Sequence, residues 1–437
     1  MTTSEVVDYG SINDQESAED NTNTIERRLS CSLAIKFITS LGFLVFASIL
    51  LFILSEEYFP PTPKPCNYPL FQMTPNQQDS NNNNNNNTNN NTPITTTIPD
   101  PTAYPHRLFI HRTNTTIPIL GFPSVALARL SNKSTDQPIA NSAVRHAVED
   151  LQIGYFDVAP EYGDGVAQSR LGPALLPYRH HVFLAAKTMY RDAIGSKHDL
   201  ENTLRALQTD HLDLYQFHSI STQEDVDLIL DEQNGAIRTF RWAKSVGKIK
   251  AIGFSAHSEP MAVKMIESGL VDTCMFPINF VSYHYGGVGK QVLEAAIQHG
   301  VGVIALKAGA RGRLTPQTGE AVHVPLSFHH IPEWKRQEMI HYPVVTSPKY
   351  STWYEPEDDP VELNKLVLWA LNQPGVTAVL PPGTMELLDG IADMLRGKDE
   401  VPQLSEEDVV GMRRRYEEME TVPIFHNRSV SGTKVST

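Results

Sequence analysis

Between about residue 106 and residue 425 the chain repeats one pattern, in which an amphipathic helix is followed by a short apolar run. Val144, Ala147, Val148 and Leu151 fall at positions i, i+3, i+4 and i+7, which is one face of a helix, and the run YFDVA follows them. The other segments that fit the strand pattern are IPILGF, HVFLAAK, LDLYQFH, KIKAIGFS, LVDTCMFPI, VGVIAL and VTAVLP.

Glycine separates most of the expected helices from the strand that comes next. Gly154, Gly247, Gly269, Gly300 and Gly375 each stand shortly before an apolar run. Because glycine readily adopts the left-handed conformation that ends a helix, we expect helix C-termini near these positions.

Apolar strands that alternate with helices predict an α/β fold with a parallel sheet covered on both faces. Eight of them favour closure into a (β/α)8 TIM barrel over residues 106–425. A doubly wound open sheet is the alternative, but no G-x-G-x-x-G follows the first strand, so that fold's usual dinucleotide site is missing.

The segment 313–360 interrupts the repeat with many prolines and aromatic residues. In a barrel it forms a long loop after the seventh strand, on the face where active sites lie. Loops of this length are uncommon unless they are functional. We interpret it as the lid of a substrate pocket, with an insertion of no functional role as the alternative.

The ends of the chain have a different composition. Residues 1–30 are polar and acidic, residues 56–105 are rich in Asn, Thr and Pro, and residues 426–437 form a short tail. None of these segments can build a core, so we expect a disordered N-terminal tail and a disordered spacer on either side of residues 31–55.

Residues 31–55 are expected to form a single transmembrane helix. The run from 37 to 54, FITSLGFLVFASILLFIL, is uncharged and long enough to cross a lipid bilayer. A cleavable signal peptide is the rival reading, but a long polar tail precedes the run and LSEEYF after it offers no small-residue cleavage site.

Charge on either side of the run predicts its orientation. Arg27, Arg28 and Lys36 precede it, whereas Glu56 and Glu57 follow it. Positive flanks remain in the cytosol, so we expect a single-pass membrane protein whose barrel lies on the non-cytosolic side.

Composition excludes some partners and sites. A formal net charge of -14 argues against a nucleic acid partner, which would require a basic face. The cysteines Cys31, Cys66 and Cys274 are too few and too scattered for a disulfide framework or a metal site.

Polar residues end three consecutive apolar runs, where a barrel places its reactive side chains. They are Asp157 in YFDVA, Lys187 in FLAAK and His218 in LYQFH, and Tyr162 lies in the loop after the first of these runs. Each one alone is more often a structural residue. Together they supply a proton donor, a cation and a carboxylate beside it, and a hydrogen-bond donor for a carbonyl oxygen. We expect Lys187 to lower the pKa of Tyr162, with Asp157 holding the lysine charged.

The same segments resemble the aldo-keto reductase family. FDVAPEYGDGVAQSRLG is similar to the motif around that family's catalytic Asp and Tyr, FLAAKT to its lysine strand and LQTDHLDLYQFH to its histidine strand. GKIKAIGFSAHS and ALNQPGVTAVLPPG match later segments in order, so the resemblance covers about residues 107–423. It implies that Tyr162 is the general acid, that Lys187 and Asp157 tune it, and that His218 orients a carbonyl or alcohol substrate.

The resemblance also implies a nicotinamide cofactor, NADP or NAD. It assigns cofactor contacts to five residues, namely Ser255, Arg311, Gly312, Gly383 and Thr384. Ala256 stands in place of the family's asparagine, and its glutamine and stacking aromatic are replaced near Met275 and Leu306. No Lys or Arg follows Gly383 in TMELLDG, so these residues do not support NADP over NAD.

Two functions follow from these observations. The intact Asp, Tyr, Lys and His set favours an oxidoreductase that transfers hydride between a nicotinamide and an aldehyde, ketone or sugar-like carbonyl. The altered cofactor positions favour the alternative, a catalytically silent, membrane-tethered barrel that acts as a binding or regulatory module.

Overall fold

The computed structural model describes residues 98–100, 102–110, 115–129, 137–314, 320–322, 344–346, 350, 352 and 354–425. Within this part of the chain, no helix is both long enough and apolar enough to cross a membrane. The predicted span 37–54, the tail before it, most of the spacer and the C-terminal tail lie outside the described residues.

One eight-stranded parallel sheet forms the centre of the molecule, in the order β14-β9-β8-β7-β6-β5-β4-β3. A parallel bridge between Leu120 and Val379 joins the segment before β3 to β14, which closes the sheet into a barrel. All eight predicted strands are present, and the predicted barrel is confirmed. Its strands are β3 (Phe122–Pro123), β4 (Tyr155–Asp157), β5 (Phe183–Thr188), β6 (Leu212–Ile220), β7 (Ile249–Ala256), β8 (Thr273–Phe276), β9 (Gly302–Leu306) and β14 (Val376–Leu380).

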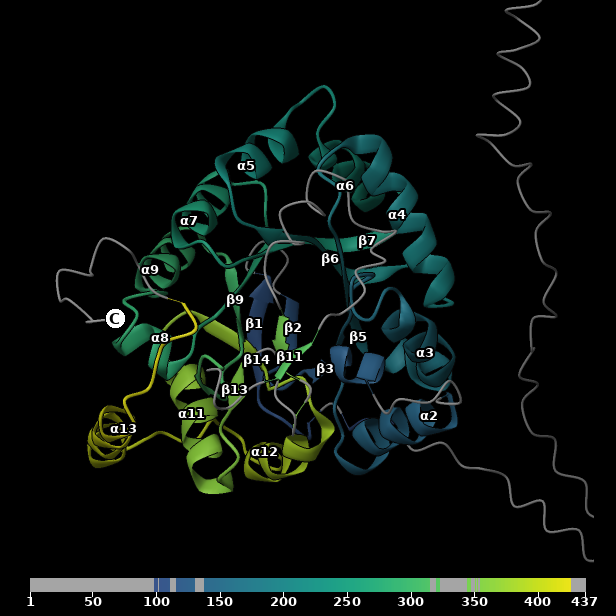
Figure 1. Ribbon diagram of the computed structural model, residues 1–437. Coiled ribbons are helices and arrows are strands. Elements are labelled where there is room, and N and C mark those ends of the chain that lie inside the picture. The colour runs from purple at the N-terminus through teal and green to yellow at the C-terminus, as the bar shows by residue number, and fades with distance from the viewer. Residues whose placement is uncertain are drawn as a thin grey trace, which may run out of the picture. The chain divides into compact units, whose positions relative to one another are not determined.

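Helices surround the barrel, as Figure 1 shows. The α-helices are α2 (Gln137–Arg145), α3 (Val166–Leu175), α4 (Ala193–Ala206), α5 (Gln223–Leu230), α6 (Ala236–Ser245), α7 (Glu259–Glu267), α8 (Phe280–His284), α9 (Lys290–His299), α11 (Pro360–Asn372), α12 (Leu388–Leu395) and α13 (Glu406–Glu418). Short helical turns are η1 (Ser124–Arg129), η2 (His146–Asp150), η3 (Leu176–His181) and η4 (Met385–Leu387).

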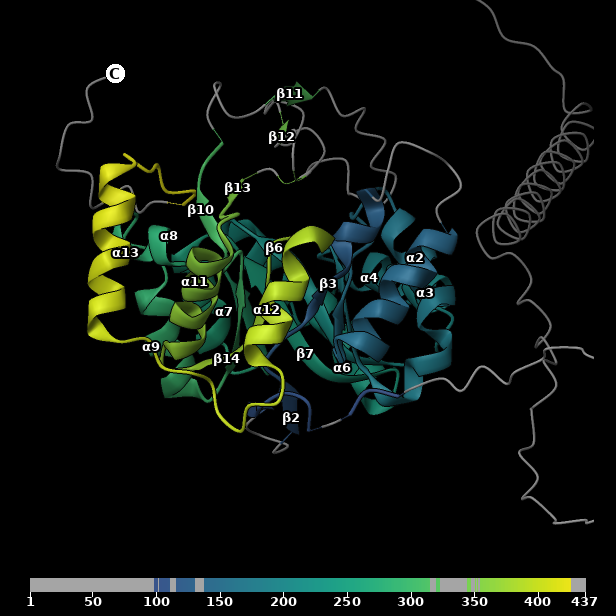
Figure 2. The same cartoon turned by 90° about the horizontal axis from the view of Figure 1, so that it is seen from below.

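Short antiparallel pairs sit at the two ends of the barrel. β1 (His106–Ile110) and β2 (Thr115–Pro118) form a hairpin that the sequence analysis did not predict. At the other end, β10 (Ala310–Gly312) pairs with β13 (Glu355–Pro356), and β11 (Glu320–Val322) pairs with β12 (Val344–Thr346). Figure 2 shows β2 at one end of the barrel and β10 and β13 at the opposite end.

The barrel interior is a packed apolar core. Ile117 of β2 joins it, so the hairpin contributes a side chain that fills the barrel from one end. The buried members of this cluster are Ile117, Tyr155, Ala185, Leu214, Ala251, Met275, Ile304, Ala378 and Leu380. Because this end is filled, a small molecule can enter only where the strands end, at the other face.

The predicted glycine helix stops are confirmed at four of five positions. Gly247, Gly269, Gly300 and Gly375 have φ values between 64° and 85°, the left-handed conformation expected after a helix. Gly154 does not, and the prediction for it was wrong. That helix ends earlier, and Gln152 takes the left-handed conformation instead, with φ 61°.

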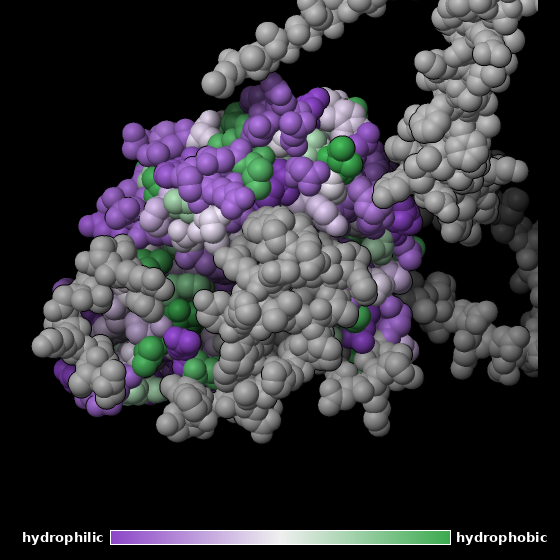
Figure 3. All heavy atoms as spheres, turned by 45° about the horizontal axis from the view of Figure 1, so that its top comes forward, coloured by the Kyte–Doolittle hydropathy of each residue, from purple (hydrophilic) through white to green (hydrophobic). Residues whose placement is uncertain are grey.

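Polar side chains cover most of the described face that Figure 3 presents, with single apolar residues scattered among them. Large apolar side chains are exposed one at a time on several helices, such as Ile194 on α4 and Leu228 on α5. Scattered exposure of this kind is normal for a protein surface and does not mark an interface.

Candidate active site

The four residues predicted to carry the chemistry meet at the C-terminal ends of neighbouring strands. Asp157 ends β4, Lys187 lies near the end of β5, His218 lies near the end of β6, and Tyr162 is in the loop after β4. The Lys187 ammonium forms a buried ion pair with Asp157, and its Nζ lies 3.0 Å from the Tyr162 hydroxyl oxygen. The structure therefore brings together all four residues that the sequence analysis singled out.

Asp157 and Lys187 act as a fixed pair beneath the phenol. Their side chains are 2% and 1% exposed, so neither charge can be screened by water. Gln216 Nε2 donates to Asp157 Oδ2 at 3.1 Å, which holds the carboxylate that faces the lysine. Although burial works against it, Asp157 and Tyr162 raise the pKa of Lys187 above its ordinary value, so this lysine remains charged.

The pKa of Tyr162 differs from our expectation. Burial raises it, and this effect outweighs the Lys187 charge and hydrogen bond, which lower it. The net pKa therefore lies above the ordinary value of a tyrosine, and the phenol stays protonated at neutral pH. The expected lowering by Lys187 exists, but desolvation of the ring exceeds it.

His218 is oriented by a residue that the sequence analysis missed. Glu161 Oε2 lies 2.7 Å from His218 Nδ1, and the two side chains are 10% and 15% exposed. Arg191 Nη2 donates to the His218 backbone carbonyl at 2.7 Å and so holds the backbone at this position. The His218 and Tyr162 rings meet edge to face, with centroids 5.9 Å apart. Because Glu161 binds Nδ1, His218 can offer Nε2 to a substrate oxygen.

Asp157, Tyr162, Lys187 and His218 line a cavity of about 200 Å³. The sixteen lining residues are Pro123, Val125, Asp157, Tyr162, Lys187, His218, Ser255, His257, Met275, Leu306, Lys307, Thr352, Tyr354, Leu380, Pro381 and Gly383. Thr352 and Tyr354 come from the 313–360 segment, as expected if it covers a pocket. The sequence analysis did not single out His257 and Lys307, although each follows an apolar run, the same signal that pointed to Lys187 and His218.

The predicted cofactor residues divide into two groups. Ser255 and Gly383 line the cavity, and Thr384 directly follows Gly383. Ser255 Oγ accepts a hydrogen bond from the Ser219 backbone N–H at 2.8 Å, which leaves its hydroxyl proton available as a donor. A Cβ on Gly383 would lie 2.5 Å from Val125 Cγ1, so a larger residue would force the Val125 side chain to move.

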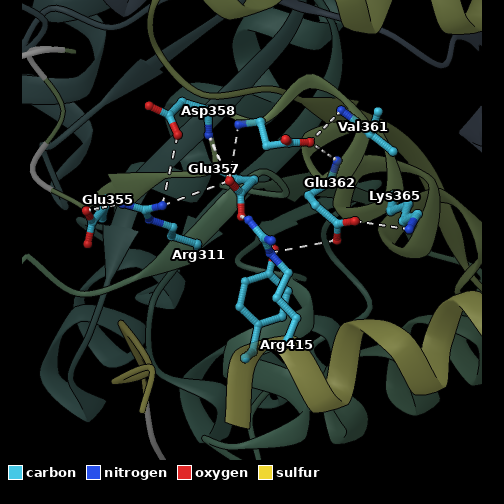
Figure 4. Close-up of polar contacts among 10 residues, drawn as sticks. Arg311, Glu355, Glu357, Asp358, Val361, Glu362, Lys365 and Arg415 are labelled. Carbon is cyan, nitrogen blue, oxygen red and sulfur yellow. Dashed lines mark hydrogen bonds and ion pairs between the residues drawn. The ribbon is translucent and has the colours of Figure 1, made fainter. Parts of the chain in front are cut away.

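Arg311 and Gly312 are not brought into the cavity. Arg311 on β10 lies 2.5 Å from Glu355 Oε1 and 3.9 Å from Glu357 Oε1. Glu357 is fully buried, and its Oε2 accepts from the Tyr416 hydroxyl at 3.0 Å and lies 3.4 Å from Arg415 Nη2. Figure 4 shows Arg311 among these carboxylates, with Arg415 approaching from α13. In this arrangement Arg311 holds the end of the 313–360 segment against the barrel.

Comparison with known proteins identifies the family of the chain. The sequence model of the Aldo/keto reductase family matches residues 124–387, which is more than half of the chain. This chain belongs to the aldo/keto reductase family. The matched range begins at η1, just after β3, and runs to η4, so it includes every cavity-lining residue except Pro123.

Two bacterial reductases are similar to parts of the chain. YhdN of Bacillus subtilis (strain 168) is 26% identical over 275 residues, which cover 59% of this chain and 80% of the relative. Methylglyoxal reductase YeaE of Escherichia coli (strain K12) is 40% identical over 79 residues, or 18% of this chain and 28% of the relative.

Solved structures share the barrel. An aldo-keto reductase from Klebsiella pneumoniae in complex with NADPH has a TM-score of 0.51 at 20% identity, covering 74% of this chain and 98% of that one. The glycerol dehydrogenase AKR11B4 from Gluconobacter oxydans has a TM-score of 0.50 at 18% identity, covering 77% of this chain and 100% of that one. At these identities the likeness shows the fold alone.

Proposed function

We propose that the chain is an NAD(P)-dependent oxidoreductase that reduces a carbonyl compound with Tyr162 as the general acid. The observation that carries this proposal is the contact of 3.0 Å between Lys187 Nζ and the Tyr162 hydroxyl, above a buried ion pair with Asp157. A lysine ammonium in this position can stabilise the negative charge that develops on the Tyr162 oxygen when the phenol gives up its proton.

Each residue has a separate part in the reduction. The His218 imidazole and the Tyr162 hydroxyl donate hydrogen bonds to the carbonyl oxygen and hold the carbonyl carbon open to attack. When bound in this cavity, a reduced nicotinamide would supply the hydride for this carbon. As the oxygen becomes an alkoxide, Tyr162 transfers its proton to it, and the Lys187 ammonium stabilises the phenolate that remains. Alcohol oxidation runs the same steps in reverse, with the phenolate as base.

The residues of the cavity fit a nicotinamide. The Ser255 hydroxyl can donate to the carboxamide oxygen, and Met275 and Leu306 present apolar surface to the ring. Gly383 lies shortly after β14, and because it has no side chain its backbone is open to the cavity. A solved relative from Klebsiella pneumoniae holds NADPH, which supports the same cofactor type here. No residue in the described site selects NADP over NAD.

The silent barrel is the second candidate. It is favoured by Met275 and Leu306, apolar residues in the cavity where the family resemblance places a glutamine and an aromatic ring. Met275 cannot donate the hydrogen bond of a glutamine, and Leu306 cannot stack on the nicotinamide as an aromatic ring does. Both changes should raise the Kd of the cofactor.

One experiment separates the two candidates. NADPH and NADH are titrated against the purified chain and against Tyr162→Phe, with nicotinamide fluorescence as the readout. The substitution leaves packing nearly unchanged, so we expect both proteins to bind cofactor alike, while carbonyl turnover by the variant falls about 100-fold or more. Absence of binding at millimolar cofactor would establish the silent barrel, and full turnover by Tyr162→Phe would remove Tyr162 from the mechanism.

We also propose that residues 37–54 anchor the protein in a lipid bilayer as a single pass, with the barrel on the non-cytosolic side. The support is the apolar run itself and the basic residues Arg27, Arg28 and Lys36 before it.

A further inference from the structure

Two basic side chains that the proposed reduction does not use line the cavity. Lys307 directly follows β9, His257 directly follows β7, and Lys307 Nζ lies 2.9 Å from His257 Nε2. β8 lies between β7 and β9 in the sheet. The two side chains therefore meet across the C-terminal end of β8, next in sequence to the cavity residues Ser255 and Leu306. They stand at the place that the proposed reduction gives to the nicotinamide.

The two lysines of this cavity differ in their protonation. Although burial lowers it, Asp157 and Tyr162 raise the pKa of Lys187, so that lysine stays charged. Burial, and after it the charge of Lys187, lower the pKa of Lys307 to about 7. At neutral pH about half of the Lys307 side chains therefore carry a neutral amine. A lysine that is desolvated or lies near a second cation can attack a carbonyl group, because only the neutral amine has a lone pair to give.

His257 is placed to take a proton from Lys307. An ammonium group has donors and no acceptor, so Lys307 donates and His257 Nε2 accepts. Phe425 stacks on His257 with ring centroids 5.1 Å apart and planes at 10°, which holds the imidazole in this orientation. The Phe425 centroid also lies 5.4 Å from Lys307 Nζ. This second contact favours the ammonium form, against burial and the Lys187 charge, which favour the amine.

The backbone at Lys307 is strained. Its φ of 59° lies in the left-handed region, which is uncommon for a residue other than glycine. Strain of this kind is concentrated at functional sites, so it directs attention to what the lysine side chain contributes.

We propose that, when no cofactor is bound, Lys307 binds a small aldehyde or ketone covalently as an imine, with His257 as the base. The Lys307 amine attacks the carbonyl carbon and forms the C–N bond. His257 Nε2 then carries the two N–H protons in turn to the carbonyl oxygen, the first as the hydroxyl forms and the second as it leaves as water and the C=N bond forms. The step consumes no oxidant and no reductant. It goes beyond the proposed reduction, because it needs no nicotinamide.

The imine and the nicotinamide exclude each other. Both would occupy the space next to Ser255 and Leu306, in a cavity of about 200 Å³. A carbonyl compound that is bound to Lys307 therefore competes with the cofactor, and hydrolysis of the imine reopens the site.

The first test traps the imine in the full-length protein without any nicotinamide. Butanal and sodium cyanoborohydride are added at pH 7, which converts an imine into a stable secondary amine, and peptide mass spectrometry locates the adduct. We expect Lys307 to be labelled at least about 10-fold faster than Lys290, an exposed lysine at the start of α9, because an exposed lysine holds almost no neutral amine at this pH. Labelling of Lys307 no faster than Lys290, or labelling of Lys187 in its place, would overturn the proposal.

The variant His257→Gln tests the base. Glutamine keeps a hydrogen-bonding side chain but cannot carry a proton, so we expect the labelling of Lys307 to slow by about 10-fold or more while that of Lys290 is unchanged. Lys290→Arg is the matched control and should leave the labelling of Lys307 as in the wild type. An undiminished rate at Lys307 in His257→Gln would overturn the role of His257. The wild-type measurement stands by itself if this variant does not fold.

The pH dependence of Lys307 is measured with trace acetic anhydride, which acetylates only neutral amines. Among the described residues, the other titratable groups of the cavity are Asp157, Tyr162, Lys187, His218, His257 and Tyr354. With a pKa of about 7, Lys307 should react about 10-fold faster at pH 8 than at pH 6 and then level off. Exposed lysines should continue to gain reactivity above pH 8. A rate at Lys307 that rises in parallel with theirs would overturn the proposal.

A last measurement adds NADP⁺ or NAD⁺, whichever binds, to the trapping reaction. At about ten times its Kd the cofactor should slow the labelling of Lys307 about 10-fold and leave Lys290 unchanged. A cofactor that binds without protecting Lys307 would overturn the shared site. A chain that binds no cofactor but is labelled at Lys307 would refute the proposed reductase and support the imine, whereas a chain that reduces carbonyls but is never labelled at Lys307 would refute the imine alone.

Discussion

At the scale of single residues, the site depends on charges that are buried together. Lys187 is 1% exposed, and it contacts both the Asp157 carboxylate and the Tyr162 hydroxyl. Removing water makes each of these interactions stronger than it would be at the surface. The same burial raises the pKa of Tyr162, so the site favours a protonated phenol that is ready to act as an acid.

Lys187→Met tests this coupling. Lys187 lowers the pKa of Tyr162, and Asp157 raises it, so the substitution removes the lowering effect and leaves the raising one. Alcohol oxidation requires the Tyr162 phenolate. The pH at which the oxidation rate rises should therefore be higher in the variant than in the wild type. The measurement is the pH profile of oxidation by the wild type and the variant.

The control for this prediction is the double variant Asp157→Asn/Lys187→Met. It removes both charges, so its profile should lie between those of the wild type and the single variant. The single variant also leaves a buried carboxylate without its cation, which costs about 3–5 kcal/mol of stability and should be followed by thermal unfolding. A profile that stays in place while activity persists would show that Lys187 and Tyr162 are not coupled.

At the scale of elements, β10 and β13 join the 313–360 segment to the barrel. Their pairing is short, and it is reinforced by Arg311 on one strand and Glu355 on the other. Glu357 continues the connection to α13 through Tyr416 and Arg415, and its Oε1 accepts from the backbone N–H groups of the next two residues. Because Tyr354 lines the cavity just before β13, this network also fixes one wall of the site.

Glu357→Ala should loosen that wall. The substitution leaves buried donors without their acceptor and breaks ion pairs with two partly exposed arginines, so we expect a loss of about 3 kcal/mol in urea unfolding. Amide hydrogen exchange should increase in the peptides around β13. Arg241→Met breaks an exposed pair with Glu232 and should change stability by less than about 1 kcal/mol. Equal effects of the two substitutions would mean that the Glu357 network does not hold the segment.

At the scale of the whole molecule, the described residues form the barrel, and the proposed membrane attachment depends on the run 37–54. The two parts can be tested separately. A chain that begins at Thr102 lacks the tail, the run and nearly all of the spacer. We expect it to be soluble and to keep the cofactor affinity of the full chain, since the cavity residues all come later. The measurement is sedimentation together with the fluorescence titration.

The full-length chain tests the anchor and its orientation. It should stay in the membrane pellet after carbonate extraction, because an apolar helix of this length is held by the bilayer core. Protease added to sealed microsomes should spare the barrel. Release by carbonate would rule out the anchor, whereas digestion of the barrel in sealed vesicles would place it on the cytosolic side.

The sequence by itself determined the repeat and singled out the residues that we propose react. Each strand is an apolar run and each helix has an apolar stripe, and these periodicities are local properties of the chain. Asp157, Lys187 and His218 could be found because polar residues at the ends of buried strands must gather on one barrel face. The glycines that end helices before four of the strands could also be predicted, because glycine adopts the left-handed backbone conformation more easily than any other residue.

Only the tertiary structure decided the rest, because it depends on contacts between distant segments. Glu161 orients His218 across two different strand ends, and Lys307 meets His257 across β8. The place of Arg311 among carboxylates depends on how a long segment returns to the barrel. The pKa of Tyr162 also required the fold, because burial and a neighbouring cation act in opposite directions and their balance depends on the packing around the ring.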